Sequence, residues 1–407
     1  MLKKSNKATL LLTLSSMFEY YDFIIYGLMS GYLGILFFPN ENPLVSQLQA
    51  FSLFALGYIV RPLGGMLLAI LGDSYNRRAI FIRSNFILAI STLIIALLPN
   101  YSQIGITATV ILIILRILQA ASFAVELPGA MSLIKQHNDK PTRSFGFVLS
   151  ATSIGAILAT LCLYVLETKY SKTEILDFAW RIPFILGSIL CLVSAFMRKD
   201  LPDIPQNLKH KATFIADILP EYKNIFSSIL VIALPAFLIV TNILFPIFIP
   251  KYYGYETKEV YLAISISLVW AAFFSAFFSY IIHDLSKETV LRVIISSSIF
   301  LGLIINFLFL REGFWQLIIG LCIFQCIITS MMICIFPLMA EIFPSAIRFT
   351  LITFCYNLTY SIIAFSPILI SWLCDSWNSP FGLWLILIIL CVFILSNFRG
   401  FKGSSNS

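Results

Sequence analysis

Apolar stretches long enough to cross a lipid bilayer recur along this chain, and they constrain its fold more than any other feature. The hydrocarbon core of a bilayer requires about 20 consecutive, mostly apolar residues of helix. Backbone groups find no water there, so helices are the natural spanning element. We predict twelve spans, at residues 9–37, 47–71, 79–98, 104–134, 145–167, 179–197, 225–250, 259–282, 290–310, 314–340, 348–373 and 379–397.

Composition supports a membrane protein and argues against a nucleic-acid partner. The 407 residues are 59% hydrophobic and only 12% charged, about half the charge of an ordinary soluble domain. The net charge of +7 comes from Lys and Arg, of which nineteen of 27 fall in segments on one side of the predicted spans. Such a bias marks cytoplasmic loops. We therefore expect a multi-pass protein of the cell inner (plasma) membrane with both termini cytoplasmic.

The longest polar stretch, RKDLPDIPQNLKHKATFIADILPEYKN, separates the sixth predicted span from the seventh. It divides the chain into an N-terminal six-helix bundle at 1–198, a central cytoplasmic linker at 199–223 and a C-terminal six-helix bundle at 224–407 with a short cytoplasmic tail. The predicted fold is therefore an all-α membrane protein with twelve transmembrane helices in two pseudo-symmetric bundles.

Charged side chains within the predicted spans are few and are candidate functional residues. The first span contains FEYYDFIIYG, and on a helix Glu19, Asp22 and Tyr26 share one face. Arg116 and Glu126 lie in the fourth span. Ionisable groups at membrane depth are costly and usually mark a solute or ion path. The alternative, that these charges only tie helices together, stays open at this point.

Signatures of enzymes, pumps and metal sites are missing from the sequence. There is no HExxH, G-x-S-x-G or phosphate-binding G-x-x-x-x-G-K-[ST] motif. The eight cysteines form no CxxC pair and are interpreted as small apolar residues. We expect a protein that is not an enzyme and that binds neither cofactor nor metal.

The segment LLAILGDSYNRR resembles the loop signature of the major facilitator superfamily, G-x-x-x-D-R-x-G-R-R/K. Gly72, Asp73, Arg77 and Arg78 are kept, whereas Ser74 and Asn76 replace an arginine and a glycine. In that family the loop's Asp and Arg latch the cytoplasmic ends of the two halves in the outward-facing state. The resemblance assigns these four residues to a cytoplasmic latch loop.

Further segments resemble the metabolite:proton symporters of this superfamily, and the proline/betaine transporters in particular. They are FEYYDFIIYG at 18–27, RPLGG at 61–65, LRILQAASFAVELPGA at 115–130, WRIPFILG at 180–187, AEIFPSAIRFT at 340–350 and YNLTYSI at 356–362. In the fourth span, Ala120, Ala124 and Val125 replace glycines of the family pattern. The matches extend over residues 18–362.

The resemblance implies proton-driven import of a small organic solute by alternating access, with no cofactor and with the proton gradient as energy source. Its site residues for proton coupling and solute binding are Glu19, Asp22, Tyr26, Arg116, Gln119, Glu126, Asn357 and Tyr360. The three carboxylates would exchange protons, and Arg116 would tune them and pair with a solute carboxylate. We expect a monomer in the lipid bilayer. An α-ketoglutarate/dicarboxylate-type symporter and a transport-deficient solute sensor remain alternatives.

Overall fold

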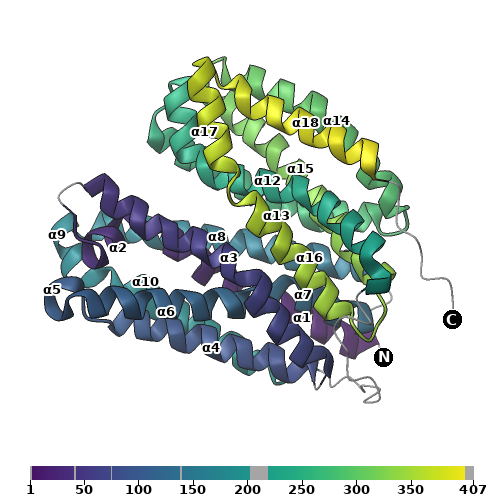
Figure 1. Ribbon diagram of the computed structural model, residues 1–407, viewed down its shortest axis with the longest axis horizontal. Helices are drawn as coiled ribbons and strands as arrows, with labels where there is room; N and C mark the ends of the chain where they lie inside the picture. Colours follow the sequence, from purple (N-terminus) through teal and green to yellow (C-terminus); the bar gives the residue numbers. More distant parts are fainter. Residues whose placement is uncertain (1, 41–42, 75, 138–139, 202–218, 399–407) are drawn as a thin grey trace. The chain divides into compact units, whose positions relative to one another are not determined.

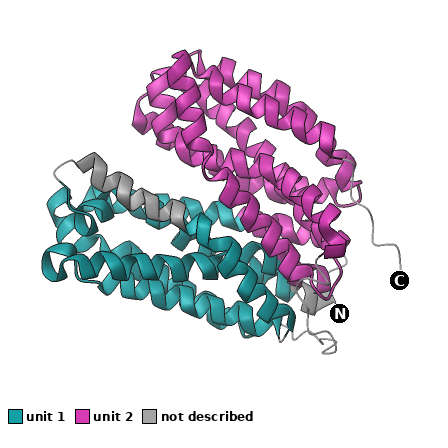
Figure 2. Ribbon diagram, viewed as in Figure 1, with its two compact units in different colours: residues 1–130, 151–212 teal, residues 131–150, 213–407 magenta. Residues whose placement is uncertain are grey.

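The computed structural model describes residues 2–40, 43–74, 76–137, 140–201 and 219–398, and within these residues the regular elements are all helical (Figure 1). Two compact units divide the chain (Figure 2). Unit 1 comprises Met1–Ala130 and Ala151–Ala212, and unit 2 comprises Met131–Ser150 and Thr213–Ser407. The predicted linker lies largely outside the described residues, as does the end of the predicted C-terminal tail, so the domain boundaries drawn from the sequence stay a prediction.

Unit 1 contains the helices that carry most of the predicted site. They are α1 (Leu2–Leu28), α2 (Ser30–Phe37), α3 (Pro43–Ser74), α4 (Arg77–Leu97), α5 (Tyr101–Ile104), α6 (Ile106–Phe123), α9 (Lys172–Glu174), a π-helix (Ile175–Ala179) and α10 (Arg181–Arg198). The helix α10 packs against α1 and α4, and α6 packs against α3 and α4. These contacts place α1, α4, α6 and α10 around one shared interior.

Two helices are divided between the units, and the remaining ones belong to unit 2. The divided helices are α7 (Glu126–His137) and α8 (Pro141–Lys169). Unit 2 adds a 3₁₀ turn (Leu219–Glu221), α12 (Tyr222–Tyr253), α13 (Thr257–Ile282), α14 (Lys287–Phe309), α15 (Phe314–Ile342), α16 (Arg348–Ile363), α17 (Ser366–Trp377) and α18 (Phe381–Asn397). Here α15 packs against α12, α13 and α14.

The helices of the structure correspond to the twelve spans predicted from the sequence. Nine helical segments among the described residues are long and apolar enough to cross a membrane, and α1 with α2 forms a tenth span that bends by 59° at its break. The shorter α18 and the long α3 match the two remaining predicted spans. Two further spans among the described residues are interrupted, between α6 and α7 and between α16 and α17. The first interruption falls at Ala124 and Val125, where the family pattern has glycines.

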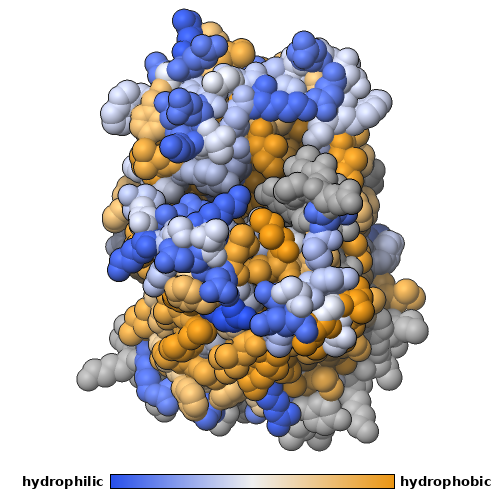
Figure 3. Space-filling view, turned by 90° about the vertical axis from the view of Figure 1, so that its left-hand side faces the viewer, coloured by the Kyte–Doolittle hydropathy of each residue, from blue (hydrophilic) through white to orange (hydrophobic). Residues whose placement is uncertain are grey.

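Large apolar side chains cover much of the outer surface of these helices. Figure 3 shows hydrophobic residues in continuous patches beside groups of hydrophilic residues. Leu63 in unit 1 and Phe273 and Trp315 in unit 2 are each about two-thirds exposed or more. A water-soluble protein rarely exposes apolar patches of this extent. The surface is that of helices whose outer solvent is lipid.

Backbone groups at the end of a helix lack partners within the helix, and the residues at these ends are suited to that. Asn76 is the N-cap of α4, and its side-chain oxygen accepts a hydrogen bond from the backbone N–H of Ala79 at 3.0 Å. This role accounts for an asparagine where the family signature has glycine. In unit 2, Gly254 ends α12 with a φ of 79°, a conformation that glycine adopts without strain.

Gly155 of α8 allows close approach to α1, the helix that carries Glu19 and Asp22. A Cβ atom at Gly155 would collide with the backbone carbonyl oxygen of Met17 and lie 3.1 Å from the backbone nitrogen of Tyr21. Because backbone atoms cannot move aside cheaply, we expect Gly155→Ala to destabilise the protein by about 1–3 kcal/mol, the usual cost of overpacking. A lower unfolding temperature of the purified protein in detergent would show this.

Gly57→Ala is the matched control for that substitution. A Cβ atom at Gly57 would lie 3.5 Å from the Cβ of Ala120, which is an ordinary contact. This variant should therefore unfold close to the wild-type temperature. Equal unfolding temperatures for the two variants would contradict the close α1–α8 contact.

Candidate functional site

The polar face of α1 points into the interior of unit 1. Glu19 is 1% exposed, Asp22 is 2% exposed and Tyr26 is 1% exposed. The helical spacing predicted that these three residues share a face, and the structure buries all three. Burial of two carboxylates demands partners that compensate for lost hydration. Those partners fall into two groups, one around Glu19 and one around Asp22.

The first group, which we call the glutamate–arginine cluster, consists of Glu19, Glu126 and Arg198. One guanidinium nitrogen, Nη2 of Arg198, contacts Oε1 of Glu19 and lies 2.5 Å from Oε2 of Glu126. Asn85 and Ser194 also donate hydrogen bonds to Oε1 of Glu19, at 2.7 and 2.6 Å. The two carboxylates therefore share one buried cation.

Arg198 is a site residue that the sequence pattern did not indicate, because it directly follows the predicted sixth span, at 179–197, and so resembles a loop residue. The structure makes it the last residue of α10, with a side chain that is 0% exposed. Its Nη1 donates to the backbone carbonyl of Phe81 at 2.9 Å, and its Cζ lies 3.6 Å from the centroid of the Phe81 ring. Arg198 thus turns inward from the end of its helix. The sequence did not indicate that Arg198 contacts the buried glutamates, because a pair of basic residues at the end of a span, here Arg198 and Lys199, is typical of a topology signal.

The second group is a hydrogen-bond chain that connects Arg116 to Asp22. Nη1 of Arg116 donates to Oε1 of Gln119 at 2.9 Å, and Nε2 of Gln119 donates to Oγ1 of Thr92 at 2.7 Å. The Thr92 hydroxyl in turn donates to Oδ1 of Asp22 at 2.8 Å. Arg116 also lies 3.6 Å above the centroid of the Tyr26 ring. Four of the predicted residues, Asp22, Tyr26, Arg116 and Gln119, are therefore connected. Thr92, which was not predicted, links Gln119 to Asp22.

Gly187, the last residue of the segment WRIPFILG, leaves space for the carboxylate of Asp22. A Cβ atom at this position would lie 3.0 Å from Oδ1 of Asp22 and 3.6 Å from Cγ2 of Thr92. Any larger side chain would press on the acceptor of the Thr92 hydrogen bond. This close approach gives a physical reason for glycine at this point of α10.

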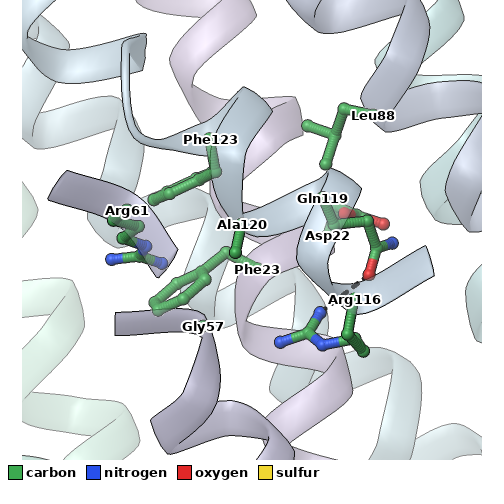
Figure 4. A pocket seen from close by; sticks show the side chains of 9 residues that line it. All are labelled: Asp22, Phe23, Gly57, Arg61, Leu88, Arg116, Gln119, Ala120 and Phe123. Atoms are coloured by element: carbon green, nitrogen blue, oxygen red, sulfur yellow. Dashed lines mark hydrogen bonds between the residues drawn. The ribbon is translucent and has the colours of Figure 1, made fainter. Parts of the chain in front are cut away.

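A pocket lies beside this chain within unit 1. It is narrow, with space for about one water molecule, and its lining consists of Asp22, Phe23, Gly57, Arg61, Leu88, Arg116, Gln119, Ala120 and Phe123. Figure 4 shows Arg61 and Arg116 on opposite sides of this lining, with Phe23 and Ala120 between them. One carboxylate and two guanidiniums in a mostly apolar lining resemble a site for a small polar solute.

The predicted latch residues lie together at the junction of α3 and α4. Nε of Arg77 donates to Oδ1 of Asp73 at 2.7 Å, and both side chains are largely buried. Nη2 of Arg78 donates to the backbone carbonyl of Lys199, directly after Arg198. Gly72 occupies the last turn of α3. The loop is thus connected to the end of α10 that carries the glutamate–arginine cluster.

Two predicted site residues, Asn357 and Tyr360, lie on α16 in unit 2. Nδ2 of Asn357 donates to the backbone carbonyl of Thr353 at 2.8 Å, and the side chain is buried. The ring centroid of Tyr360 lies 4.5 Å from that of Tyr356. Their part in solute binding stays a prediction. Among the described residues, no group of three or more His, Cys, Asp or Glu is arranged to hold a metal ion.

Comparison with known proteins places the chain in a family. The sequence model named Major Facilitator Superfamily matches residues 9–364. The chain belongs to the major facilitator superfamily. Members of this superfamily are multi-pass membrane transporters, so this protein is a transporter with the twelve-helix fold predicted from its sequence, and it is not an enzyme.

Curated relatives resemble this major facilitator protein over most of its length. A Staphylococcus aureus (strain COL) protein, provisionally named a proline/betaine transporter, is 28% identical and the match covers 93% of this chain and 84% of the relative. The proline/betaine transporter of Escherichia coli (strain K12) is 27% identical, with 92% and 78% covered. These matches agree with the resemblance found in the motifs.

Solved structures confirm the fold. The proton:xylose symporter XylE from E. coli superimposes with a TM-score of 0.80 at 15% identity, covering 97% of this chain and 95% of XylE. The human organic anion transporter MFSD10 gives a TM-score of 0.78 at 11% identity, with 97% and 99% covered. At these identities the comparison concerns the fold alone.

Proposed function

We propose that this protein is a proton-coupled symporter that imports a small organic solute by alternating access of its two units. The solute class that we favour is proline or betaine, which the named relatives support. Asp22, Glu19 and Glu126 would carry the coupled proton. The protein would work as a monomer in the cell inner (plasma) membrane, with both termini in the cytoplasm, where the excess of Lys and Arg lies.

The observation that carries this proposal is the position of Asp22. Its buried carboxylate belongs to the lining of the pocket and is joined to Arg116 through Thr92 and Gln119. A proton on Asp22 removes the one negative charge that the described residues contribute to the lining, so proton binding and solute binding would act on the same electrostatic balance. Ionisable groups buried at membrane depth usually mark a solute or ion path, which supports a coupling role for Asp22.

A dicarboxylate-type symporter is the second candidate, and the charge of the pocket favours it. The lining sets one carboxylate, Asp22, against two guanidiniums, Arg61 and Arg116. An excess of positive charge attracts an anionic solute more strongly than a zwitterion with no net charge. Uptake of 2-oxoglutarate in place of proline would therefore select this alternative without changing the mechanism.

Transport by the purified protein in proteoliposomes tests the proposed function. Radiolabelled proline, glycine betaine, 2-oxoglutarate and shikimate are offered with and without an imposed pH gradient, acidic outside. We expect one of these solutes to accumulate above its external concentration only when the gradient is present. A proton-conducting ionophore should abolish the accumulation.

Two other results would count against symport. Binding of a solute without any accumulation would identify a transport-deficient sensor. Accumulation that is indifferent to both the gradient and the ionophore would identify a carrier that is not coupled to protons. Empty liposomes and liposomes with heat-denatured protein provide the background.

A further inference from the structure

Arg61 of α3 carries a buried positive charge that no described carboxylate neutralises. Its side chain is 4% exposed, and its Nε has no hydrogen-bond partner among the described residues. Three aromatic rings surround the guanidinium, with Cζ at 4.6 Å from the centroid of Phe23, 4.4 Å from that of Tyr58 and 4.9 Å from that of Phe123. Cation–π contacts compensate only part of the hydration that a buried guanidinium loses.

Arg116, the other guanidinium of the pocket, is already engaged. It donates to Gln119, lies over the ring of Tyr26 and is connected through Thr92 to Asp22. These contacts suit a residue that orients Asp22. The Nε of Arg116, like that of Arg61, has no hydrogen-bond partner among the described residues. What distinguishes Arg116 is that the negative charge of Asp22 acts on it, so its positive charge is already partly compensated.

The surroundings of Arg61 suit the capture of an oxyanion. A guanidinium that packs over aromatic rings still presents its N–H donors in its own plane, where a carboxylate can accept two of them. The rings of Phe23 and Phe123, which are stacked with centroids 4.6 Å apart, fix the position of the group. Arg61, Phe23 and Phe123 all belong to the lining of the pocket, so an anion there would reach this group.

We propose that Arg61 is the residue that binds the carboxylate of the transported solute, and that Phe23, Tyr58 and Phe123 position it. This inference rests on the proposed function for the existence of a transported solute, and it moves the carboxylate contact from Arg116, where the sequence analysis placed it, to Arg61. The ligand class is a small organic molecule with at least one carboxylate. A zwitterion such as proline and a dicarboxylate such as 2-oxoglutarate both satisfy this requirement.

Pairs of probes that differ at the carboxylate test the inference by binding, independently of transport. Proline is compared with prolinamide and glycine betaine with choline, and 2-oxoglutarate represents the dicarboxylates. Binding is measured by ligand-dependent shifts of the unfolding temperature of the detergent-purified protein. The variants are Arg61→Gln, Arg61→Lys and, as a matched arginine that packs on the Trp180 ring at the far end of α10, Arg181→Gln.

We expect wild type to bind at least one carboxylate probe and to prefer each bound probe over its carboxylate-free partner. Arg61→Gln should weaken binding of that probe at least about thirtyfold, because it removes one side of a buried charged hydrogen bond. Arg61→Lys should keep part of the affinity, since it preserves the charge but loses the two-pronged geometry. Arg181→Gln should bind as wild type does.

The outcomes separate the two proposals. A wild type that binds a carboxylate probe but never accumulates it leaves the role of Arg61 intact and overturns symport. A wild type that accumulates the probe, while Arg61→Gln and Arg61→Lys bind it with unchanged affinity, overturns the role of Arg61. If Arg61→Gln does not fold, Arg61→Lys decides: unchanged affinity and unchanged discrimination between partners in that variant overturn the inference. A wild type that binds prolinamide or choline as tightly as the carboxylate probes overturns it as well.

Discussion

Replacement of Arg198 with leucine is expected to leave almost no folded protein. The side chain is fully buried, and its Nη2 is the shared cationic partner of Glu19 and Glu126. Leucine fills part of the volume but leaves two carboxylates buried without a cation. Breaking a buried ion pair from one side costs about 3–5 kcal/mol, which is a large fraction of the stability of a typical protein.

The arrangement of the cluster predicts that loss of one glutamate and loss of the arginine have unequal effects on stability. Glu19→Gln or Glu126→Gln removes one of two negative charges that share a single guanidinium, so each leaves a neutral pair and should fold about as well as wild type. The triple variant Arg198→Leu, Glu19→Gln, Glu126→Gln carries no unpaired charge and should recover most of the folded protein that Arg198→Leu loses. Yield of monodisperse protein and its unfolding temperature in detergent measure all of these.

Arg181→Leu is the control for the Arg198 substitution, because it removes an arginine from the opposite end of the same helix. Arg181 is partly exposed and donates to the backbone carbonyls of Asp177 and Leu98, at 3.2 and 3.4 Å. We expect a small loss of stability there. If Arg198→Leu unfolded at the same temperature as Arg181→Leu, the buried cluster would not hold these helices together.

The sequence predicted the helices and the polar face of α1 well because both depend on short-range pattern. Span positions follow from apolar length, and the burial of Glu19, Asp22 and Tyr26 follows from the helical period. The contact between Arg116 and Gln119 also follows from this period, since the two residues are three positions apart on α6. Such relations need no knowledge of how distant segments meet.

Partners that are distant in the sequence could not be predicted in this way. Arg198 lies 72 positions after Glu126 and far from Glu19, and its place beside Lys199 gives it the pattern of a loop residue. One signal was available: away from their ends, the predicted spans contain three carboxylates, Glu19, Asp22 and Glu126, but only two arginines, Arg61 and Arg116. Thr92 offered no signal, because one hydroxyl among many in apolar helices is unremarkable until its neighbours are known.

Replacement of Asp22 with asparagine is expected to separate solute binding from proton coupling. Asparagine has nearly the same shape, and its Oδ1 can still accept the hydrogen bond that Thr92 donates to Asp22 at 2.8 Å. The variant should therefore fold and keep exchange of solute across the membrane. It cannot release a proton, so accumulation driven by a pH gradient should be lost.

The size of this effect follows from the energy in the gradient. One pH unit supplies about 1.4 kcal/mol per proton, which sustains about tenfold accumulation when one proton moves with each solute. In proteoliposomes, wild type should approach this ratio, whereas Asp22→Asn should remain near equal concentrations on both sides. Exchange of internal unlabelled solute for external labelled solute, measured without a gradient, should be retained by both.

The same assay, applied to Glu19→Gln and Glu126→Gln, assigns the coupling proton to one of the two groups. If Asp22→Asn alone loses accumulation, the proton travels on the carboxylate of the pocket, and the glutamate–arginine cluster serves to hold α1, α7 and α10 together. If Asp22→Asn still accumulates solute and a glutamine variant does not, the proton belongs to the shared pair of glutamates. In that case Asp22 acts only through the charge balance of the pocket, because the chain through Thr92 and Gln119 would then orient a carboxylate that never changes its protonation.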